Sequence, residues 1–420
     1  MSASSKKTAS FIQRNLGEPD AAELRIRLKS KPGASKRGAL PGGTAVTPER
    51  VDARWKAIGS PTETRAALAG FGPEVFARNV ENFIGTVQIP LGVAGPLRVN
   101  GLFAQGDYFL PLATTEAALV ASFDRGARLL TEAGGCSAMM VNEGVSRAPG
   151  FAFHSLADAG EFVLWAGQRL DDIRAAAEAT TRFGRLLDVR FTVEGNHIYL
   201  QLEFSTGGAA GQNIVTIATQ AVCDFITANS PVKPEYHFVE ANFSGDKKAS
   251  ALSFSTVRGR KVSAEVVLAP ELVKRRLHTT AARMVDYWRM SAIGGVMSGT
   301  IGVQGHYANG LAALYLATGQ DAACVAESAV GITRFELRED GSLYAAVTLP
   351  NIIVGTIGGG TGLPGQRACL EILNLTRPED ANALAEVCAA LALAGELSII
   401  GALSAQEFSR AHRRLARGKK

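Results

Sequence analysis

Two adjacent ammonium groups beside a carboxylate mark one stretch of the chain as a candidate reaction centre. Asp246, Lys247 and Lys248 follow the small residues Ser244-Gly245. A lysine ammonium is a compact charge with three donors, and it suits an oxygen that becomes anionic during a reaction. In an extended segment the two lysine side chains would point to opposite sides and could hold two different groups. The alternative is a solvated turn whose charges contact only water.

Two acids lie at the expected ends of helices. Glu116 precedes an Ala-rich helix over 117–131, where the helix dipole favours the charged form of a carboxylate. Helix capping is the alternative function for this residue. Asp321 follows an apolar helix over 308–318, where the dipole opposes a negative charge. We therefore expect a compensating cation beside Asp321.

A glycine-rich segment and a C-terminal histidine complete the set of candidates. Gly355 to Gly362 contains consecutive glycines, which let a backbone approach a ligand closely. Residues 360–365 match GxGxxG, but Pro364 and the lack of an acidic partner on a following strand make a Rossmann site a poor interpretation. His412 lies in a short basic helix that residues 404–407 open as a capping box. A surface histidine is the alternative.

The composition is that of an ordinary globular protein. The 420 residues are 46% hydrophobic and 20% charged, enough for two or three domains with a sizeable core. We find neither an apolar run long enough to span a bilayer nor a signal peptide, so we expect a cytoplasmic protein without a membrane partner. The five cysteines are never paired as CxxC and the six histidines show no metal-binding spacing. We therefore expect a reducing compartment and no metal site.

The net charge of +5 is concentrated at the ends of the chain. Residues 1–40 carry nine Lys and Arg against three Asp and Glu, and residues 410–420 are also rich in Arg and Lys. No aromatic residues alternate with these basic residues, so we expect no nucleic-acid partner. A polyanionic small molecule would fit the C-terminal charges equally well, and a solvated end is the alternative.

The order of helical and strand patterns predicts a small α+β insert within a larger α+β domain. The insert contains a helix over 155–181, a hairpin of 187–193 with 197–204, and a helix from 207 to 229. Around the insert we expect further elements: a helical region from 47 to 79, a strand at 108–112, a hairpin of 252–257 with 261–267, a strand pair around 339–341, a helix over 275–291 and a buried helix over 378–403.

Six short motifs, taken in order, resemble the 3-hydroxy-3-methylglutaryl-CoA (HMG-CoA) reductase family over roughly residues 75–420. They are Glu81–Gly85 with Pro90–Leu97, Ala113–Glu116, Asp246–Lys248, Gly319–Ala323, Gly355–Thr361, and His412. The glycine motif is most similar to that of the class shared by eukaryotes and archaea, which uses NADPH. The membrane anchor of the animal enzymes has no counterpart here.

The resemblance implies an α+β HMG-CoA reductase fold. In this fold a large domain surrounds a long central helix and carries an inserted, ferredoxin-like nucleotide-binding domain. The domains it implies are a basic, partly disordered tail (1–45), a helical N-terminal region (46–80), the first part of the large substrate-binding domain (81–149), the small NADP-binding domain (150–238) and the second part of the large domain (239–420). It also implies a homodimer, or a higher homo-oligomer, with active sites between subunits.

The resemblance implies reduction of a thioester by two hydrides, through a hemithioacetal and an aldehyde, to mevalonate and CoA. The cofactor would be NADPH, with NADH as a further possibility. Lys247 would hold the carbonyl oxygen as it gains negative charge, and Glu116 would supply a proton at the aldehyde stage. Asp321 would lie between them and tune both. His412 would protonate the departing CoA thiolate, which suits a histidine pKa near 7.

The binding residues also follow from the resemblance. Lys248 with Arg147 would bind the glutaryl carboxylate, while Asp246 and Asn309 would orient the lysines. The expected CoA contacts are Ser122, Arg125 and His306. The expected dinucleotide contacts are Thr181, Arg182, Gly211, Gln212, Asn213, Gly358 and Gly359.

Four positions depart from the family pattern. Gly208 replaces an aspartate of the nucleotide loop, and Glu240 replaces a serine beside the substrate. Asp124 and His278 replace an asparagine and a lysine on the CoA side. These changes leave two alternatives open, a reductase of another branched acyl-CoA and a non-catalytic CoA-ester-binding protein. Retention of all four catalytic positions counts against the second.

Overall fold

The structure is a computed structural model that describes residue 22 and residues 47–58, 70–77, 79–256 and 258–406. The chain divides into two compact units, Met1–Val87 and Gln88–Lys420. In the first unit, α3 (Pro48–Ile58) begins after Thr47, whose side-chain oxygen accepts the backbone N–H of Arg50. A short 3₁₀ helix, η1, spans Pro73–Phe76. The helical region expected over 47–79 is therefore confirmed only over these two elements.

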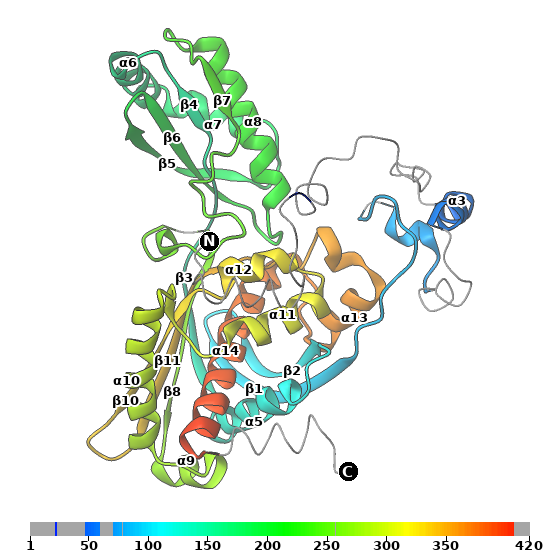
Figure 1. Ribbon diagram of the computed structural model, residues 1–420, viewed down its shortest axis with the longest axis vertical. Helices are drawn as coiled ribbons and strands as arrows, with labels where there is room; N and C mark the ends of the chain where they lie inside the picture. Colours follow the sequence, from blue (N-terminus) through cyan, green and yellow to red (C-terminus); the bar gives the residue numbers. More distant parts are fainter. Residues whose placement is uncertain (1–21, 23–46, 59–69, 78, 257, 407–420) are drawn as a thin grey trace. The chain divides into compact units, whose positions relative to one another are not determined.

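The second unit is built on an eleven-stranded sheet with the order β7-β4-β6-β3-β8-β11-β10-β9, with β1 and β2 joined beside β3 and β5 beside β6 (Figure 1). The strands are β1 (Leu91–Gly101), β2 (Gln105–Ala113), β3 (Cys136–Arg147), β4 (Gly150–Ala152), β5 (Arg185–Glu194), β6 (His197–Ser205), β7 (Tyr236–Phe238), β8 (Gly259–Leu268), β9 (Gly302–Val303), β10 (Gly331–Leu337) and β11 (Leu343–Ile352). The long strand β3 pairs with β8 along most of its length and with β6 at its end. It therefore connects the two halves of the sheet.

The proposed insert, 150–238, contains β4 to β7 and three helices, α6 (Leu156–Gly167), α7 (Leu170–Glu178) and α8 (Gln212–Asn229). Its buried aromatic and aliphatic side chains form a core separate from that of the large domain. The predicted hairpin is confirmed, because β5 and β6 pair in antiparallel register around the turn after Glu194. The single helix expected over 155–181 is wrong: it is two helices, separated at 168–169.

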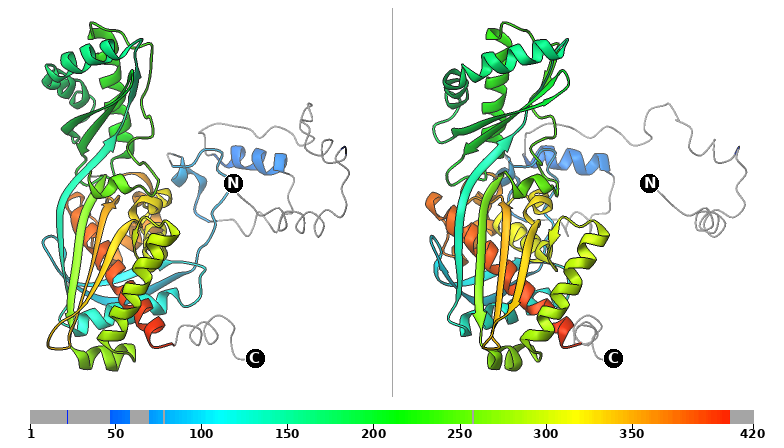
Figure 2. Two further views of the ribbon diagram at one scale, coloured as in Figure 1. Left: turned by 60° about the vertical axis from the view of Figure 1, so that its left-hand side comes forward. Right: turned by 90° about the vertical axis from the view of Figure 1, so that its left-hand side faces the viewer.

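The large domain surrounds α14 (Ala381–Ser404), which follows the 3₁₀ helix η5 (Pro378–Asp380) and packs against β3, β8 and β11 (Figures 1 and 2). The other helices of this domain are α5 (Leu119–Glu132), α9 (Pro270–Leu277), α10 (Ala281–Ser298), α11 (Tyr307–Thr318), α12 (Val325–Ser328) and α13 (Pro364–Ile372). Within the described residues, Pro378–Ser404 is the one helical stretch long and apolar enough to cross a bilayer, but 89% of its apolar window is buried inside the protein. It is the central core helix that the sequence predicted.

Two carboxylates in this apolar helix, Glu386 and Glu396, are completely buried and accept hydrogen bonds from backbone N–H groups. Glu386 accepts the N–H groups of Phe103 and Ala104 at 2.8 and 2.7 Å, and more distant ones from Leu102 and Met140. A buried carboxylate without such partners would be strongly destabilising. Glu386 therefore fixes the turn between β1 and β2 against the central helix.

Two further predictions differ from the structure. Of the strand expected over 252–257, the described residues 252–256 do not form a strand, because Ala251–Phe254 is a 3₁₀ helix, η2, capped by Ser250. The helix expected over 275–291 is two helices, since His278 ends α9 in a left-handed conformation and Thr280 caps α10. The strand pair around 339–341 is confirmed as β10 and β11.

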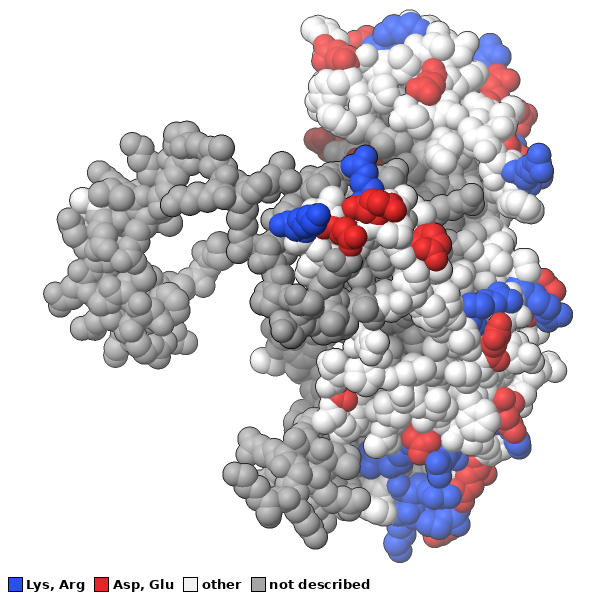
Figure 3. Space-filling view, turned by 90° about the vertical axis from the view of Figure 1, so that its right-hand side faces the viewer, with Lys and Arg blue, Asp and Glu red and all other residues white. Residues whose placement is uncertain are grey.

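Surface charges are mostly interspersed. Over most of the face drawn in Figure 3, Lys and Arg side chains lie next to Asp and Glu side chains. Ion pairs such as Arg98 with Asp107 and Arg276 with Glu132 are examples of this pairing. Exposed pairs of this kind contribute little to stability, so we attribute the stability of the fold to its two cores and to buried groups such as Glu386.

We expect Glu386→Ala to lower the free energy of unfolding by about 3 kcal/mol, because several backbone N–H groups lose a charged acceptor. Urea unfolding followed by circular dichroism measures the change. The matched control is Glu379→Ala, which removes a carboxylate that is 63% exposed in the preceding turn. Equal unfolding midpoints for the two variants would contradict the proposed function of Glu386.

Candidate active site

Lys247 lies in a tight turn rather than in an extended segment. The turn is closed by the Lys248 N–H, which donates to the Gly245 carbonyl at 3.1 Å. Lys247 has a φ of 56°, in the left-handed region that is unfavourable for residues other than glycine. Its backbone N–H donates to Oε1 of Glu327 at 3.1 Å. The chain is therefore not extended here, and the arrangement in which the two lysines would point to opposite sides is not adopted.

A buried ion pair between Arg258 and Glu327 lies beneath the surface at this turn and holds it in place. Glu327 and Arg258 are 0% and 1% exposed, and Nε of Arg258 donates to Oε2 of Glu327 at 2.7 Å. The same guanidinium bonds to the Asp246 carboxylate and donates to Oε1 of Gln212 at 2.8 Å. Burial raises the pKa of Glu327, and the charge of Arg258 opposes this rise. One guanidinium thus connects α12, the lysine turn and the first residue of α8.

The ammonium of Lys247 reaches the acid that the sequence singled out. Its Nζ lies 2.8 Å from Oδ2 of Asp321, and the two side chains are 43% and 38% exposed. The hydrogen bond to Asp321 raises the pKa of Lys247 above its usual value. Asp321 also caps the 3₁₀ helix η3 (Ala322–Cys324), whose Ala323 N–H donates to Oδ1. The compensating cation expected beside Asp321 is therefore Lys247.

Arg147, at the end of β3, is held by two acids of this chain. Its Nη1 lies 2.9 Å from Oδ2 of Asp246 and 3.5 Å from Oε2 of Glu240. Burial alone would raise the pKa of Asp246, but Arg258 and Arg147 outweigh it and hold that pKa below its usual value. Lys248 is exposed, and its ammonium donates to the Asp246 carbonyl at 2.7 Å. The turn therefore presents two lysines above a buried layer of paired charges.

Glu116 forms a second, separate group with Asn309. It lies in the turn before α5, and its Oε2 accepts the side-chain amide of Asn309 at 2.8 Å. Both residues line a pocket of about 370 Å³ between the end of β2 and α11. The other lining residues are Ile89, Ala113, Thr114, Thr115, Leu119, Ala308, Ala312, Ala313 and Leu316.

The two groups lie at opposite ends of α11. Asn309 is in the first turn of this helix, and Asp321 follows its last residue, Thr318. The nine residue steps from Asn309 to Thr318 span about 14 Å at 1.5 Å per residue. Within the described residues of one chain, no hydrogen bond or ion pair joins Glu116 to Lys247 or Asp321. The structure thus brings the candidate catalytic residues together as two half-sites.

The three expected CoA contacts gather around the central helix. Arg125 donates from Nη2 to the Ser398 carbonyl at 2.6 Å, and the hydroxyls of Ser122 and Ser398 are 2.9 Å apart. The ring of His306 stacks on Phe123 with centroids 5.1 Å apart. Neither ring nitrogen of His306 has a hydrogen-bond partner among the described residues.

The expected nucleotide contacts come from two glycine-containing loops that touch. Gly211, with a φ of 83°, caps α8, whose first residues are Gln212 and Asn213. The Thr356 N–H donates to the Gly208 carbonyl at 3.0 Å, and Ala209 pairs with Ile357. The glycine segment containing Gly358 and Gly359 is therefore adjacent to the start of α8, where free N–H groups favour phosphate.

Thr181 and Arg182 lie in the turn after α7. The hydroxyl oxygen of Thr181 accepts the N–H groups of Phe183 and Gly184 at 3.2 and 3.0 Å. A side chain added at Gly184 would meet Thr181 on one side and Ile214 of α8 on the other. This places the turn beside the first turn of α8. Arg182 is exposed there.

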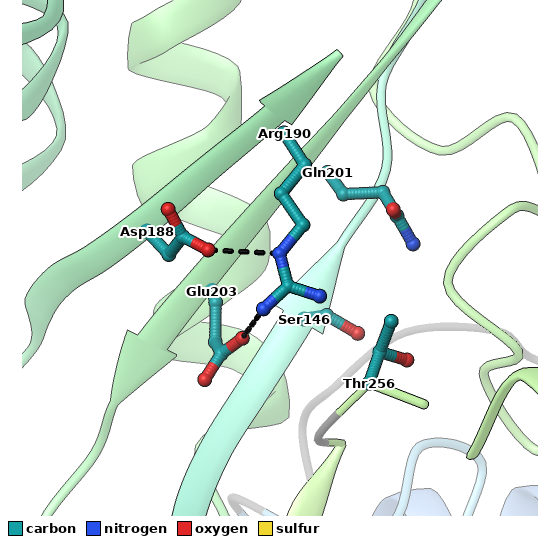
Figure 4. A pocket seen from close by; sticks show the side chains of 6 residues that line it. All are labelled: Ser146, Asp188, Arg190, Gln201, Glu203 and Thr256. Atoms are coloured by element: carbon teal, nitrogen blue, oxygen red, sulfur yellow. Dashed lines mark hydrogen bonds and ion pairs between the residues drawn. The ribbon is translucent and has the colours of Figure 1, made fainter. Parts of the chain in front are cut away.

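A water-sized pocket of about 10 Å³ lies where β3, β5 and β6 meet (Figure 4). It is lined by Ser146, Asp188, Arg190, Gln201, Glu203 and Thr256. Arg190 already pairs with both acids, at 2.8 Å to Asp188 and 3.6 Å to Glu203. The pocket has room for about one water molecule and is too small for a substrate.

Sequence reasoning missed Arg258 and Glu327. Arg258 lies between 252–257 and 261–267, the two stretches whose pattern predicts a hairpin, and no sequence pattern indicates Glu327. The available signal was a lone acid between Val325 and Val330, in an otherwise small and apolar segment. His412 lies outside the described residues. Among the described residues, no group of three His, Cys, Asp or Glu side chains could hold a metal.

Comparison with known proteins identifies the family of this chain. The family model for hydroxymethylglutaryl-coenzyme A reductase matches residues 50–417. The 3-hydroxy-3-methylglutaryl-coenzyme A reductase of Aeropyrum pernix is 43% identical over 352 residues, covering 82% of this chain and 83% of that protein. The corresponding protein of Pyrococcus horikoshii is 42% identical over 352 residues, covering 82% of this chain and 85% of that protein.

A solved structure shares the fold at lower identity. The class II 3-hydroxy-3-methylglutaryl-CoA reductase of Streptococcus pneumoniae, bound to NADPH, matches with a TM-score of 0.65 and 19% identity. The match covers 84% of this chain and 96% of that one. By its family model and its archaeal relatives, the chain belongs to the HMG-CoA reductase family.

Proposed function

We propose that this protein reduces HMG-CoA to mevalonate and CoA with NADPH as the electron donor. The observation that carries this function is the Lys247–Asp321 pair at 2.8 Å, exposed at the surface of a buried charge network. An ammonium fixed in this way is suited to an oxygen that becomes anionic as a thioester or aldehyde is reduced. Because its pKa is raised, Lys247 stays protonated throughout the physiological range.

The start of α8 fits a dinucleotide phosphate. At Gly358, no atom of the described residues lies within 4 Å of an added Cβ, so the backbone at this glycine has room for a ligand beside the helix start. Gly211, Gln212 and Asn213 would hold the phosphates on backbone N–H groups, and Arg182 would pair with the 2′-phosphate. When bound, NADPH supplies the hydrides for both reductions.

The remaining roles are proton transfer and CoA binding. Glu116 would protonate the oxygen at the aldehyde stage, with its carboxyl oriented by Asn309. His412 would protonate the departing thiolate. Ser122, Arg125 and His306 would contact CoA on the α5 side of the central helix. We propose that the enzyme is soluble and works in the cytoplasm.

We propose that the two half-sites are completed by a homodimer. Asn309, which binds Glu116, lies about 14 Å along α11 from the helix end that precedes Asp321, the partner of Lys247. Among the described residues of one chain, no hydrogen bond or ion pair links Glu116 to Lys247 or Asp321, which favours a proton donor from a second subunit. In a symmetric dimer, the Glu116 end of one subunit faces the Lys247 end of the other, which makes two identical sites.

Mixed dimers test this arrangement. We expect Lys247→Ala and Glu116→Gln each to lower NADPH oxidation with HMG-CoA by about 100-fold or more. Co-expression of the two variants should restore about a quarter of the wild-type activity, because half of the dimers are mixed and each mixed dimer has one intact site. The unfractionated mixture is assayed to measure this. Mixed dimers purified through two different tags should have about half of the wild-type activity, because each has one intact site of two.

The control pair is Lys247→Ala with Asp321→Asn. Both changes affect the same half-site, so every site in a mixed dimer is damaged and no activity should return. Sites contained within one chain would leave the first mixture as inactive as the control. A wild-type protein that does not oxidise NADPH in the presence of HMG-CoA would overturn the function itself.

The buried ion pair under the lysine turn gives a further prediction. We expect Arg258→Met to lower the free energy of unfolding by about 3–5 kcal/mol, because it leaves the completely buried Glu327 without its cation. Lys247→Ala should cost less than about 1 kcal/mol, since the Lys247–Asp321 pair is partly exposed. Urea unfolding measures both. Similar losses for the two variants would contradict this assignment of the buried pair.

A further inference from the structure

Glu240 is held against Arg147 by hydrogen bonds from its surroundings. Its Oε2 accepts the Ser244 hydroxyl at 2.9 Å and the Ala148 N–H at 3.3 Å, and it lies 3.5 Å from Nη1 of Arg147. The side chain is only 22% exposed. A carboxylate with three such partners is fixed in place, so its negative charge stays beside the guanidinium.

Arg147 is thereby occupied by groups of its own chain. Its side chain is 8% exposed, and Asp246 takes the same Nη1 at 2.9 Å. Its Nη2 donates to Oε1 of Gln212 at 3.2 Å. Two acids and an amide therefore pair with both terminal nitrogens of this guanidinium, while its Nε is buried without a hydrogen-bond partner among the described residues. Little of it remains for a ligand.

Lys248 is in the opposite situation. It is exposed, and its ammonium donates to one backbone carbonyl, that of Asp246, at 2.7 Å. A carbonyl does not neutralise the ammonium, so Lys248 keeps its full charge for a ligand. Of the two cations proposed for the substrate carboxylate, Lys248 is the one that this chain leaves available.

The charges around the turn are balanced without a substrate. The cations are Arg147, Lys247, Lys248 and Arg258, and the acids are Glu240, Asp246, Asp321 and Glu327. A substrate carboxylate is a fifth negative charge in this cluster. It would be repelled by Glu240 at short range, where partial burial weakens screening by solvent.

We propose that Glu240 is a specificity-determining residue. Its carboxylate pairs with Arg147, so that Lys248 alone binds the acyl carboxylate of the substrate. The preference of the enzyme for carboxylate-bearing acyl-CoA esters is therefore weakened. This inference rests on the proposed function, because it assigns the acyl end of the substrate to the Arg147 and Lys248 side of the lysine turn.

The test compares HMG-CoA with its carboxamide analogue, which has the same shape and lacks the charge. We expect Glu240→Gln to raise the ratio of kcat/KM for HMG-CoA over the carboxamide by about tenfold, through a lower KM for HMG-CoA. Glu240→Ser, which also removes the bulk, should shift the ratio in the same direction. Lys248→Met should shift it the opposite way.

Glu194→Gln is the matched control, since it makes the same charge change at an exposed residue at the end of β5. An unchanged ratio in both Glu240 variants, with urea midpoints like that of the wild type, would overturn the inference. An equal change in kcat/KM for HMG-CoA and for the carboxamide would overturn it too, because an effect that does not depend on the substrate charge is structural. Failure of the wild type to reduce HMG-CoA is a different result and speaks against the proposed function.

Discussion

The ion pair between Arg258 and Glu327 is the interaction on which the candidate site depends. Both side chains are almost completely buried, and Glu327 also accepts the backbone N–H of Lys247. Replacing a buried ion pair with apolar side chains is often neutral for stability, so such a pair is better explained by the conformation it enforces. Here it enforces a left-handed lysine, which the backbone would otherwise avoid. The position of the Lys247 ammonium is thus determined by the buried pair of Arg258 and Glu327.

The second constraint is the length of α11. The helix begins beside Glu396, a buried acid of the central helix that accepts the N–H groups of Gly305 and His306. It ends shortly before Asp321, whose carboxylate accepts the N–H of Ala323 in the following 3₁₀ helix. Because both ends are fixed to charged groups, the helix acts as a rigid spacer between the Glu116 pair and the Lys247 pair. A spacer of this length keeps the Glu116 pair and the Lys247 pair as two separate groups within one chain.

Sequence reasoning predicted the pairing of Asp321 with a cation, because an acid at a helix C-terminus has a cost that must be offset. It also predicted the buried central helix, since almost no charge interrupts the Ala- and Leu-rich stretch. It did not predict the turn at Lys247, because no residue type there signals a positive φ. Arg258 was missed for a related reason: Arg-Gly-Arg between apolar stretches has the pattern of a hairpin turn, while its buried contacts come from residues as distant as Ser146 and Glu327.

Two of the departures from the family pattern have different physical causes. At Gly208, an added Cβ would lie 2.5 Å from the Pro378 carbonyl, so packing against the start of the central helix excludes the aspartate that the family has there. The nucleotide loop keeps its backbone contacts, through the Thr356 N–H, and loses only a side chain. Glu240 has no such steric cause, since a serine is smaller. Its carboxylate is instead supported by Ser244 and Arg147, so the substitution adds an interaction. The first change is a consequence of packing, while the second alters the charge that a substrate meets.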